Sequence, residues 1–262
     1  MGLAYERRGT GPALVLLHGV GHRRQAWDPV FHLLAPHRTV ITVDLPGHGQ
    51  SPPLRTAGRP PVRVIAEEIF AFFDELGLDR PHVAGNSLGG ALALVAGARG
   101  RAATVTGLSP AGFWQSPWEH GYAKAVFRSA QLAGAALRPL VPALARSAPG
   151  RGVIEGAFVS RPSNVTAERA SADAVAFLRA SEAVAAVLAD RVSFAEAVPA
   201  EVPVTIAWGT KDRLLPPGQA RVALRRLPHA RFVPLTGCGH VPMTDNPELV
   251  ATVLLNGSAR AR

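Results

Sequence analysis

The chain is poor in cysteine, and it has no long hydrophobic run. Its 262 residues include a single cysteine, Cys238, which excludes a disulfide framework and a metal centre built from cysteines alone. No run of about 18 consecutive apolar residues occurs, so no transmembrane helix is expected. The N-terminus lacks the apolar segment and small-residue cleavage site of a signal peptide. We therefore expect a soluble, cytoplasmic protein that does not enter a membrane.

Lysine and aromatic residues are also scarce. The formal net charge is +9, but only Lys124 and Lys211 are lysines, and the arginines are scattered, with pairs as their closest groupings. A nucleic-acid-binding surface would cluster basic residues and interleave aromatic ones for stacking. Aromatic residues make up only 6% of the chain, whereas 47% of it is hydrophobic. The composition therefore predicts a folded domain with a large core and no nucleic-acid partner.

Strand and helix patterns alternate through most of the chain. The segment at 13–17 is a short apolar run typical of a buried strand, and further strand patterns occur at 39–43, 82–85, 103–108, 202–208 and 231–235. Helical patterns lie between or after them, at 27–34, 62–76, 88–98, 218–227 and 247–255. This alternation predicts an α/β fold with a mostly parallel central sheet and helices on both faces.

Residues 113–199 interrupt the alternation. They show no strong strand pattern, only alanine-rich helical pieces separated by prolines. The simplest organisation is a core domain of residues 1–112 and 200–262 with a helical lid inserted at 113–199. Trp114 follows the strand that precedes this insertion, so we expect it to help line an apolar substrate pocket.

The most informative motif is a glycine–x–serine–x–glycine at 85–89. It lies between an apolar strand and a helix, where a tight turn lifts one side chain above the edge of the sheet. Glycine is needed two residues either side of Ser87 because a Cβ there would collide with the turn. At a helix N-terminus, developing negative charge on Ser87 is favoured. An ordinary N-cap serine is the alternative, but the context favours a nucleophile.

A serine hydroxyl near neutral pH requires a base to take its proton. His240 follows the last predicted strand, and Asp212 follows the strand before it. An acid in this position fixes the imidazole tautomer and stabilises the imidazolium. All three residues lie just beyond the carboxyl ends of predicted parallel strands, where open α/β sheets place their sites. We predict a triad of Ser87, Asp212 and His240.

The segment at 18–21, His-Gly-Val-Gly, follows the first apolar strand and could provide a second oxyanion donor. Acyl transfer places negative charge on the former carbonyl oxygen, and fixed backbone N–H groups stabilise it. We expect the amides of Val20 and Leu88 to form this oxyanion hole and Gly19 to contact the substrate. The alternative is a plain strand-to-loop turn.

Together these motifs resemble those of the α/β-hydrolase fold superfamily over essentially the whole chain. The matching segments are at 18–21, 44–51, 85–89, 209–212 and 237–240. The resemblance implies the branch with a serine nucleophile, the triad in the order Ser, Asp, His, and a helical cap over the site. It also implies a structural role for Asp44 and Ser51. Haloalkane dehalogenases and epoxide hydrolases carry aspartate at the elbow, where this chain has serine.

The predicted function is a cofactor-free serine hydrolase acting through an acyl-enzyme on esters of small or medium hydrophobic acyl groups. No P-loop, dinucleotide motif or helical histidine pair occurs, so no nucleotide cofactor or metal is expected. The triad also allows a carbon–carbon bond hydrolase, which a pocket arginine such as Arg23 or Arg128 would favour. A perhydrolase, an acyltransferase and a non-catalytic ligand-binding protein are further alternatives. The residues predict no oligomeric state.

Overall fold

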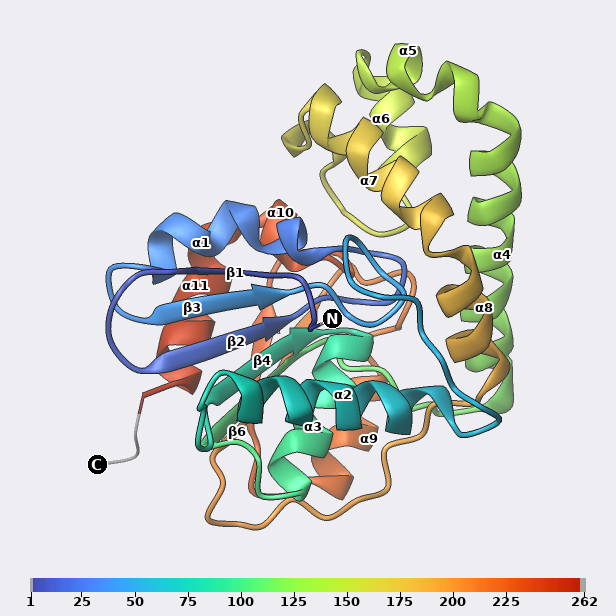
Figure 1. Cartoon of the computed structure of the whole chain (residues 1–262). Helices are drawn as coiled ribbons and strands as arrows, with labels where there is room; N and C mark the ends of the chain where they lie inside the picture. Colours follow the sequence, from blue (N-terminus) through green and yellow to red (C-terminus); the bar gives the residue numbers. More distant parts are fainter. Residues whose placement is uncertain (1, 260–262) are drawn as a thin grey trace.

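The computed structural model describes residues 2–259, and within them the centre of the fold is a seven-stranded sheet (Figure 1). The strand order is β1-β3-β2-β4-β5-β6-β7, with β1 antiparallel to β3 and every other neighbouring pair parallel. The strands are β1 Tyr5–Arg8, β2 Ala13–Leu17, β3 Thr39–Val43, β4 His82–Asn86, β5 Thr104–Leu108, β6 Val204–Gly209 and β7 Arg231–Leu235. The predicted α/β fold with a mostly parallel sheet is therefore confirmed.

The middle of the sheet is buried on both faces, which explains why its strands read as continuous apolar runs. Every residue of β4, β5 and β6 is buried. Alternate residues of β2 enter different cores: Val15 and Leu17 belong to one cluster of buried side chains, and Leu14 and Leu16 to another. The sheet therefore needs helices on both faces to cover it.

Two groups of helices provide this cover. The cluster containing Val15 is completed by α2 and α3, and the cluster containing Leu14 by α1 and α11 (Figure 1). The helices of the core are η1 Arg24–Trp27, α1 Asp28–Leu34, α2 Pro61–Glu75, α3 Leu88–Ala98, α9 Gln219–Arg226, α10 Pro242–Asp245 and α11 Pro247–Gly257. In α2, Ile65, Ile69 and Phe73 are buried at helical spacing.

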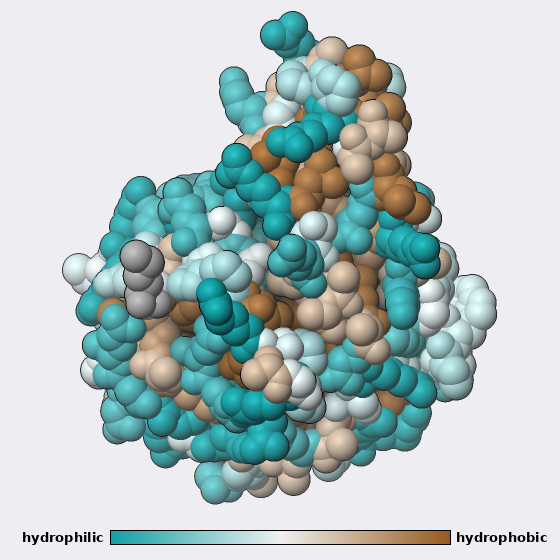
Figure 2. Space-filling model, turned by 45° about the vertical axis from the view of Figure 1, so that its right-hand side comes forward, coloured by the Kyte–Doolittle hydropathy of each residue, from teal (hydrophilic) through white to brown (hydrophobic). Residues whose placement is uncertain are grey.

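Between β5 and β6 the chain forms a run of helices that projects beyond the carboxyl ends of the strands (Figure 1). These inserted helices are α4 Pro117–Leu137, η2 Arg138–Leu140, α5 Val141–Ala145, α6 Ala148–Glu155, η3 Pro162–Asn164, α7 Ala167–Arg179 and α8 Ser181–Ala189. Figure 2 shows hydrophobic side chains gathered on this projecting part, where Leu132, Leu140 and Val153 are exposed. In the described part of the chain, no helix has both the length and the hydropathy to cross a bilayer.

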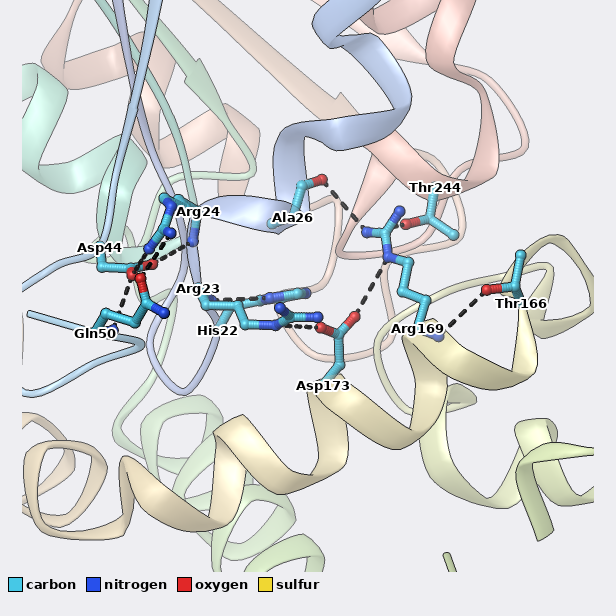
Figure 3. Close-up of polar contacts among 10 residues, drawn as sticks. All are labelled: His22, Arg23, Arg24, Ala26, Asp44, Gln50, Thr166, Arg169, Asp173 and Thr244. Carbon is cyan, nitrogen blue, oxygen red and sulfur yellow. Dashed lines mark hydrogen bonds and ion pairs between the residues drawn. The ribbon is translucent and has the colours of Figure 1, made fainter. Parts of the chain in front are cut away.

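One helix of this group, α7, is attached to the core through Asp173 (Figure 3). The Asp173 carboxylate accepts from Arg23 Nε at 2.9 Å and from Arg169 Nε at 3.3 Å. Arg169 also donates to the Ala26 carbonyl at 3.4 Å and to Thr244 Oγ1 at 3.3 Å. Charge-assisted bonds of this kind, partly shielded from water, are stronger than exposed ion pairs. They hold α7 over the loop that follows β2.

The loop after β3 is folded around Asp44, which lies beside Arg24 and Gln50 in Figure 3. Its carboxylate accepts from the main-chain N–H groups of Arg24 at 2.6 Å and Gln50 at 2.9 Å, and it is ion-paired with the Arg24 guanidinium. Ser51 Oγ donates to the Asp44 carbonyl at 2.6 Å and accepts from the Ala4 amide at 2.9 Å. These contacts hold the turn in shape, which is the structural role that the resemblance implies for Asp44 and Ser51.

Candidate active site

Ser87 occupies the sharp turn between β4 and α3. Its backbone has φ of 55° and ψ of −117°, in a region that non-glycine residues rarely adopt. A Cβ at Gly85 would lie 2.2 Å from the carbonyl oxygen of Gly89, and a Cβ at Gly89 would lie 2.0 Å from that of Leu17. The glycines are therefore required by the close approach of neighbouring backbone, as the sequence pattern predicts.

His240 and Asp212 form a buried hydrogen-bonded pair beyond the ends of β7 and β6. His240 Nδ1 donates to Asp212 Oδ2 at 2.8 Å. The other oxygen, Oδ1, accepts from the amides of Leu214 at 3.0 Å and Leu215 at 2.8 Å. Because an ionised carboxylate only accepts, this arrangement keeps the proton on Nδ1 and leaves Nε2 of His240 as the acceptor.

Two residues that the sequence analysis did not single out fix the main chain at His240. Asn86 Nδ2 donates to the His240 carbonyl at 2.8 Å and to the Leu108 carbonyl at 3.1 Å. The buried Asp245 carboxylate accepts from the amides of Gly239 at 2.7 Å and Ser160 at 3.0 Å. The histidine loop is thus tied to the serine turn and to the segment after α6. Asn86 occupies a variable position of the motif, so its type alone gave no signal.

The loop at 18–21 lies directly against the serine. A Cβ at Gly19 would be 3.2 Å from Ser87 Cβ, so glycine allows the close approach. His18 holds the loop by donating from Nδ1 to the Gly19 carbonyl at 2.7 Å and accepting a main-chain N–H at Nε2 at 3.0 Å. His48 Nε2 accepts from the Gly21 amide at 3.0 Å. Burial lowers the pKa of both histidines, which keeps them uncharged and able to accept.

A cavity of about 140 Å³ separates the serine from the inserted helices. Gly19, Val20, Ser87 and His240 line its floor, whereas its walls come mostly from apolar side chains of the inserted helices. These wall residues include Phe127, Leu137, Val141, Leu144, Phe158 and Phe177. This volume is several times what a single water needs, and the apolar walls suit a hydrocarbon group.

The structure brings most of the predicted site residues together. Ser87, His240, Gly19 and Val20 line one cavity, and Asp212 is bonded to His240. Leu88 is not among the lining residues, although its amide immediately follows the serine as the first residue of α3.

Trp114, which the sequence predicts to help line the substrate pocket, is directed elsewhere in the structure. Its indole Nε1 donates to the Val192 carbonyl at 2.6 Å, and its ring packs edge-on against His120. Trp114 is therefore used to join the two ends of the insertion, and it is not among the residues that line the cavity. The two arginines considered as substrate ligands do not line the cavity: Arg23 is paired with Asp173, and Arg128 is exposed.

Polar side chains in the cavity wall were missed by the sequence analysis. His22, Glu155 and Asp173 contribute to the lining. Burial lowers the pKa of His22 to about 4 and raises that of Glu155 to about 8. Both side chains are therefore uncharged at neutral pH. No local pattern distinguishes the three lining residues, because they meet at the cavity from the loop after β2 and from the inserted helices α6 and α7, which are far apart in the sequence.

Comparison with known proteins decides the family. The model of the family described as "Alpha/beta hydrolase family" matches residues 14–253. The chain belongs to the alpha/beta hydrolase family. It is 31% identical over 256 residues to the pimeloyl-[acyl-carrier protein] methyl ester esterase of Aeromonas hydrophila, covering 95% of this chain and 96% of that protein. The expectation of an enzyme of the α/β-hydrolase type is therefore confirmed.

Solved structures agree with this assignment. A membrane phospholipase A described as a bacterial virulence factor superposes with a TM-score of 0.77 at 25% identity, covering 99% of this chain and 84% of that one. A thermophilic esterase from Thermogutta terrifontis superposes with a TM-score of 0.73 at 23% identity, covering 97% and 92%. At that identity the second likeness shows the fold alone.

Proposed function

We propose that this alpha/beta hydrolase is a cofactor-free serine esterase that cleaves esters of small or medium hydrophobic acyl groups. The observation that carries the proposal is the bond between His240 Nδ1 and Asp212 Oδ2, beside a cavity that Ser87 and His240 both line. In this arrangement Ser87 provides the hydroxyl, His240 provides a base with a defined tautomer, and the Asp212 carboxylate orients that base. The esterase from Aeromonas hydrophila, which matches over nearly its whole length, supports ester cleavage.

The proposed reaction has two halves. In the first, His240 Nε2 takes the proton of Ser87 while the serine oxygen attacks the ester carbonyl. The amides of Val20 and Leu88 donate to the resulting oxyanion, and the imidazolium then protonates the departing alkoxide. In the second half, His240 deprotonates a water that attacks the acyl-enzyme, and the carboxylic acid leaves as Ser87 regains its proton.

We also propose that residues 113–199 form a cap over a core of residues 1–112 and 200–262. The inserted helices provide most of the apolar walls of the cavity, among them Phe127 from α4 and Phe177 from α7. Such walls favour a hydrocarbon acyl group and exclude water from the serine. The carbon–carbon hydrolase alternative is less well supported, because neither Arg23 nor Arg128 lines this cavity.

The experiment that tests the esterase proposal is replacement of Ser87. Ser87→Ala is expected to lower kcat for p-nitrophenyl butyrate by roughly 10⁴-fold or more and to abolish labelling by a fluorophosphonate. Ser181→Ala, which makes the same change at an exposed serine of α8, is the matched control and should keep both the wild-type kcat and the fluorophosphonate labelling. Turnover by a folded Ser87→Ala variant at the wild-type rate would refute the assignment.

A further inference from the structure

Glu155 is a buried carboxyl in the acyl pocket without a hydrogen-bond partner. It is the last residue of α6, only 9% exposed, and it lines the same cavity as Ser87. Across residues 2–259, no donor or acceptor bonds its side chain. The other carboxylates nearby are satisfied: Asp173 by Arg23 and Arg169, and Asp212 by His240 and two main-chain amides.

Such a group is expensive to bury, so stability does not explain its presence. A polar group that is largely removed from water and has no protein partner loses hydration that nothing in the protein replaces. Burial, together with the negative charge of Asp173, raises the pKa of Glu155 to about 8, and the positive charge of Arg169 opposes this rise. At neutral pH the side chain is therefore a carboxylic acid with one O–H donor and one carbonyl acceptor.

The surroundings of Glu155 define what it can bind. Its neighbours Val153 and Ile154 line the cavity with it, as do Phe158 and Leu144. The polar side chains of the cavity wall are Glu155, His22 and Asp173, and the Asp173 carboxylate is already bonded to Arg23 and Arg169. An ammonium substituent would require Glu155 to ionise, which burial opposes, and a carboxylate substituent would add negative charge near Asp173.

We propose that Glu155 forms a polar subsite of the acyl pocket that binds a hydroxyl group on the acyl chain, so that the preferred substrates are hydroxyacyl esters. A hydroxyl fits because it can accept from the O–H of Glu155 and donate to its carbonyl oxygen. An unsubstituted acyl chain leaves both groups unpaired, and a site built to bond a hydroxyl discriminates against the analogue that lacks it. This inference rests on the proposed esterase function.

The test compares methyl esters of ω-hydroxy acids with unsubstituted methyl esters of matched length, from six to twelve carbons. We expect the wild-type kcat/KM ratio of hydroxyacyl to alkyl ester to reach roughly tenfold at the best length, as for one hydrogen bond to a buried group. Glu155→Leu should bring that ratio close to one. Glu155→Gln should keep most of it, because an amide also donates and accepts. Glu168→Leu, the same change at an exposed residue of α7, is the matched control.

A second measurement does not depend on the leucine variant folding. A ketone can only accept, so the wild-type preference for oxoacyl over alkyl esters should fall as Glu155 ionises between pH 7 and pH 9. Glu155→Gln should keep that preference at both pH values. Taking the ratio of two substrates cancels any effect of pH on the chemical step that both substrates share. His22 stays uncharged throughout this range, because its pKa is about 4.

Stability separates a binding role from a structural one. Removing an unpartnered buried carboxyl should leave the Tm of Glu155→Leu unchanged or raised. A wild-type enzyme without hydroxyacyl preference at any length, or an unchanged ratio in a folded Glu155→Leu variant, would overturn the subsite. If Ser87→Ala also retained hydrolysis, the esterase proposal itself would fail. Loss of activity in Ser87→Ala together with no hydroxyl preference would overturn only the subsite.

Discussion

Replacing Asp212 with asparagine should move the imidazole proton of His240 from Nδ1 to Nε2 while leaving the geometry of the proposed triad intact. Asp212 Oδ1 accepts from the amides of Leu214 and Leu215, at 3.0 and 2.8 Å. Only the oxygen of an asparagine can accept these two bonds, so its NH₂ group must face His240 Nδ1. The imidazole must then carry its proton on Nε2, the nitrogen that has to accept from Ser87.

The expected effect of Asp212→Asn is large because the base is lost together with the stabilisation of the imidazolium. We expect kcat to fall by about 10⁴-fold, or about 5.5 kcal/mol of transition-state stabilisation. The assay is stopped-flow acylation by p-nitrophenyl butyrate, with urea unfolding to establish that the variant is folded. Asp79→Asn, at an exposed position, is the matched control. A loss below tenfold in a folded Asp212→Asn variant would refute this role for Asp212.

Two further predictions concern stability. Gly89→Ala would place a Cβ 2.0 Å from the Leu17 carbonyl oxygen, so the free energy of unfolding in urea should fall by about 3 kcal/mol or more; an unchanged midpoint would contradict this. The pKa of His22 is about 4 when folded, so the unfolded chain binds its proton first as pH falls. Burial of neutral His22 should therefore make the free energy of unfolding fall as the pH drops from 6.5 to 4. The total fall should be at most about 3 kcal/mol. His22→Gln should remove that part of the pH dependence.

The elements that could be predicted from the sequence are those whose cause is local. Strands β2 and β3 have the bounds that their apolar runs predict, because strands with buried side chains on both faces are largely apolar. The bounds of β7, an edge strand that is mostly exposed, also match the predicted segment at 231–235. The serine turn was predictable for a similar reason. Its glycines are required by backbone atoms only a few residues away or on the adjacent strand, so their spacing is preserved in the sequence.

The features that could not be predicted depend on contacts between distant segments. Asn86 supports the carbonyl of His240, which is 154 residues away, and the partner of the Trp114 indole is 78 residues away. The sequence shows that Trp114 follows β5, but it does not show that the indole bonds to Val192 instead of lining the cavity. Glu155 reaches the cavity because α6 packs against α5 and α7, and nothing in the sequence of α6 marks that face.

The electrostatics of the cavity suggest a common purpose for these separate features. Burial lowers the pKa of His18, His22 and His48 and raises that of Glu155, so four titratable groups around the serine are uncharged at neutral pH. Asp212 and His240 are both buried, and in such surroundings the attraction between the Asp212 carboxylate and a transient imidazolium is stronger than in solvent. The inserted helices, by excluding water, would thus contribute to the chemistry of the serine as well as to the choice of acyl group.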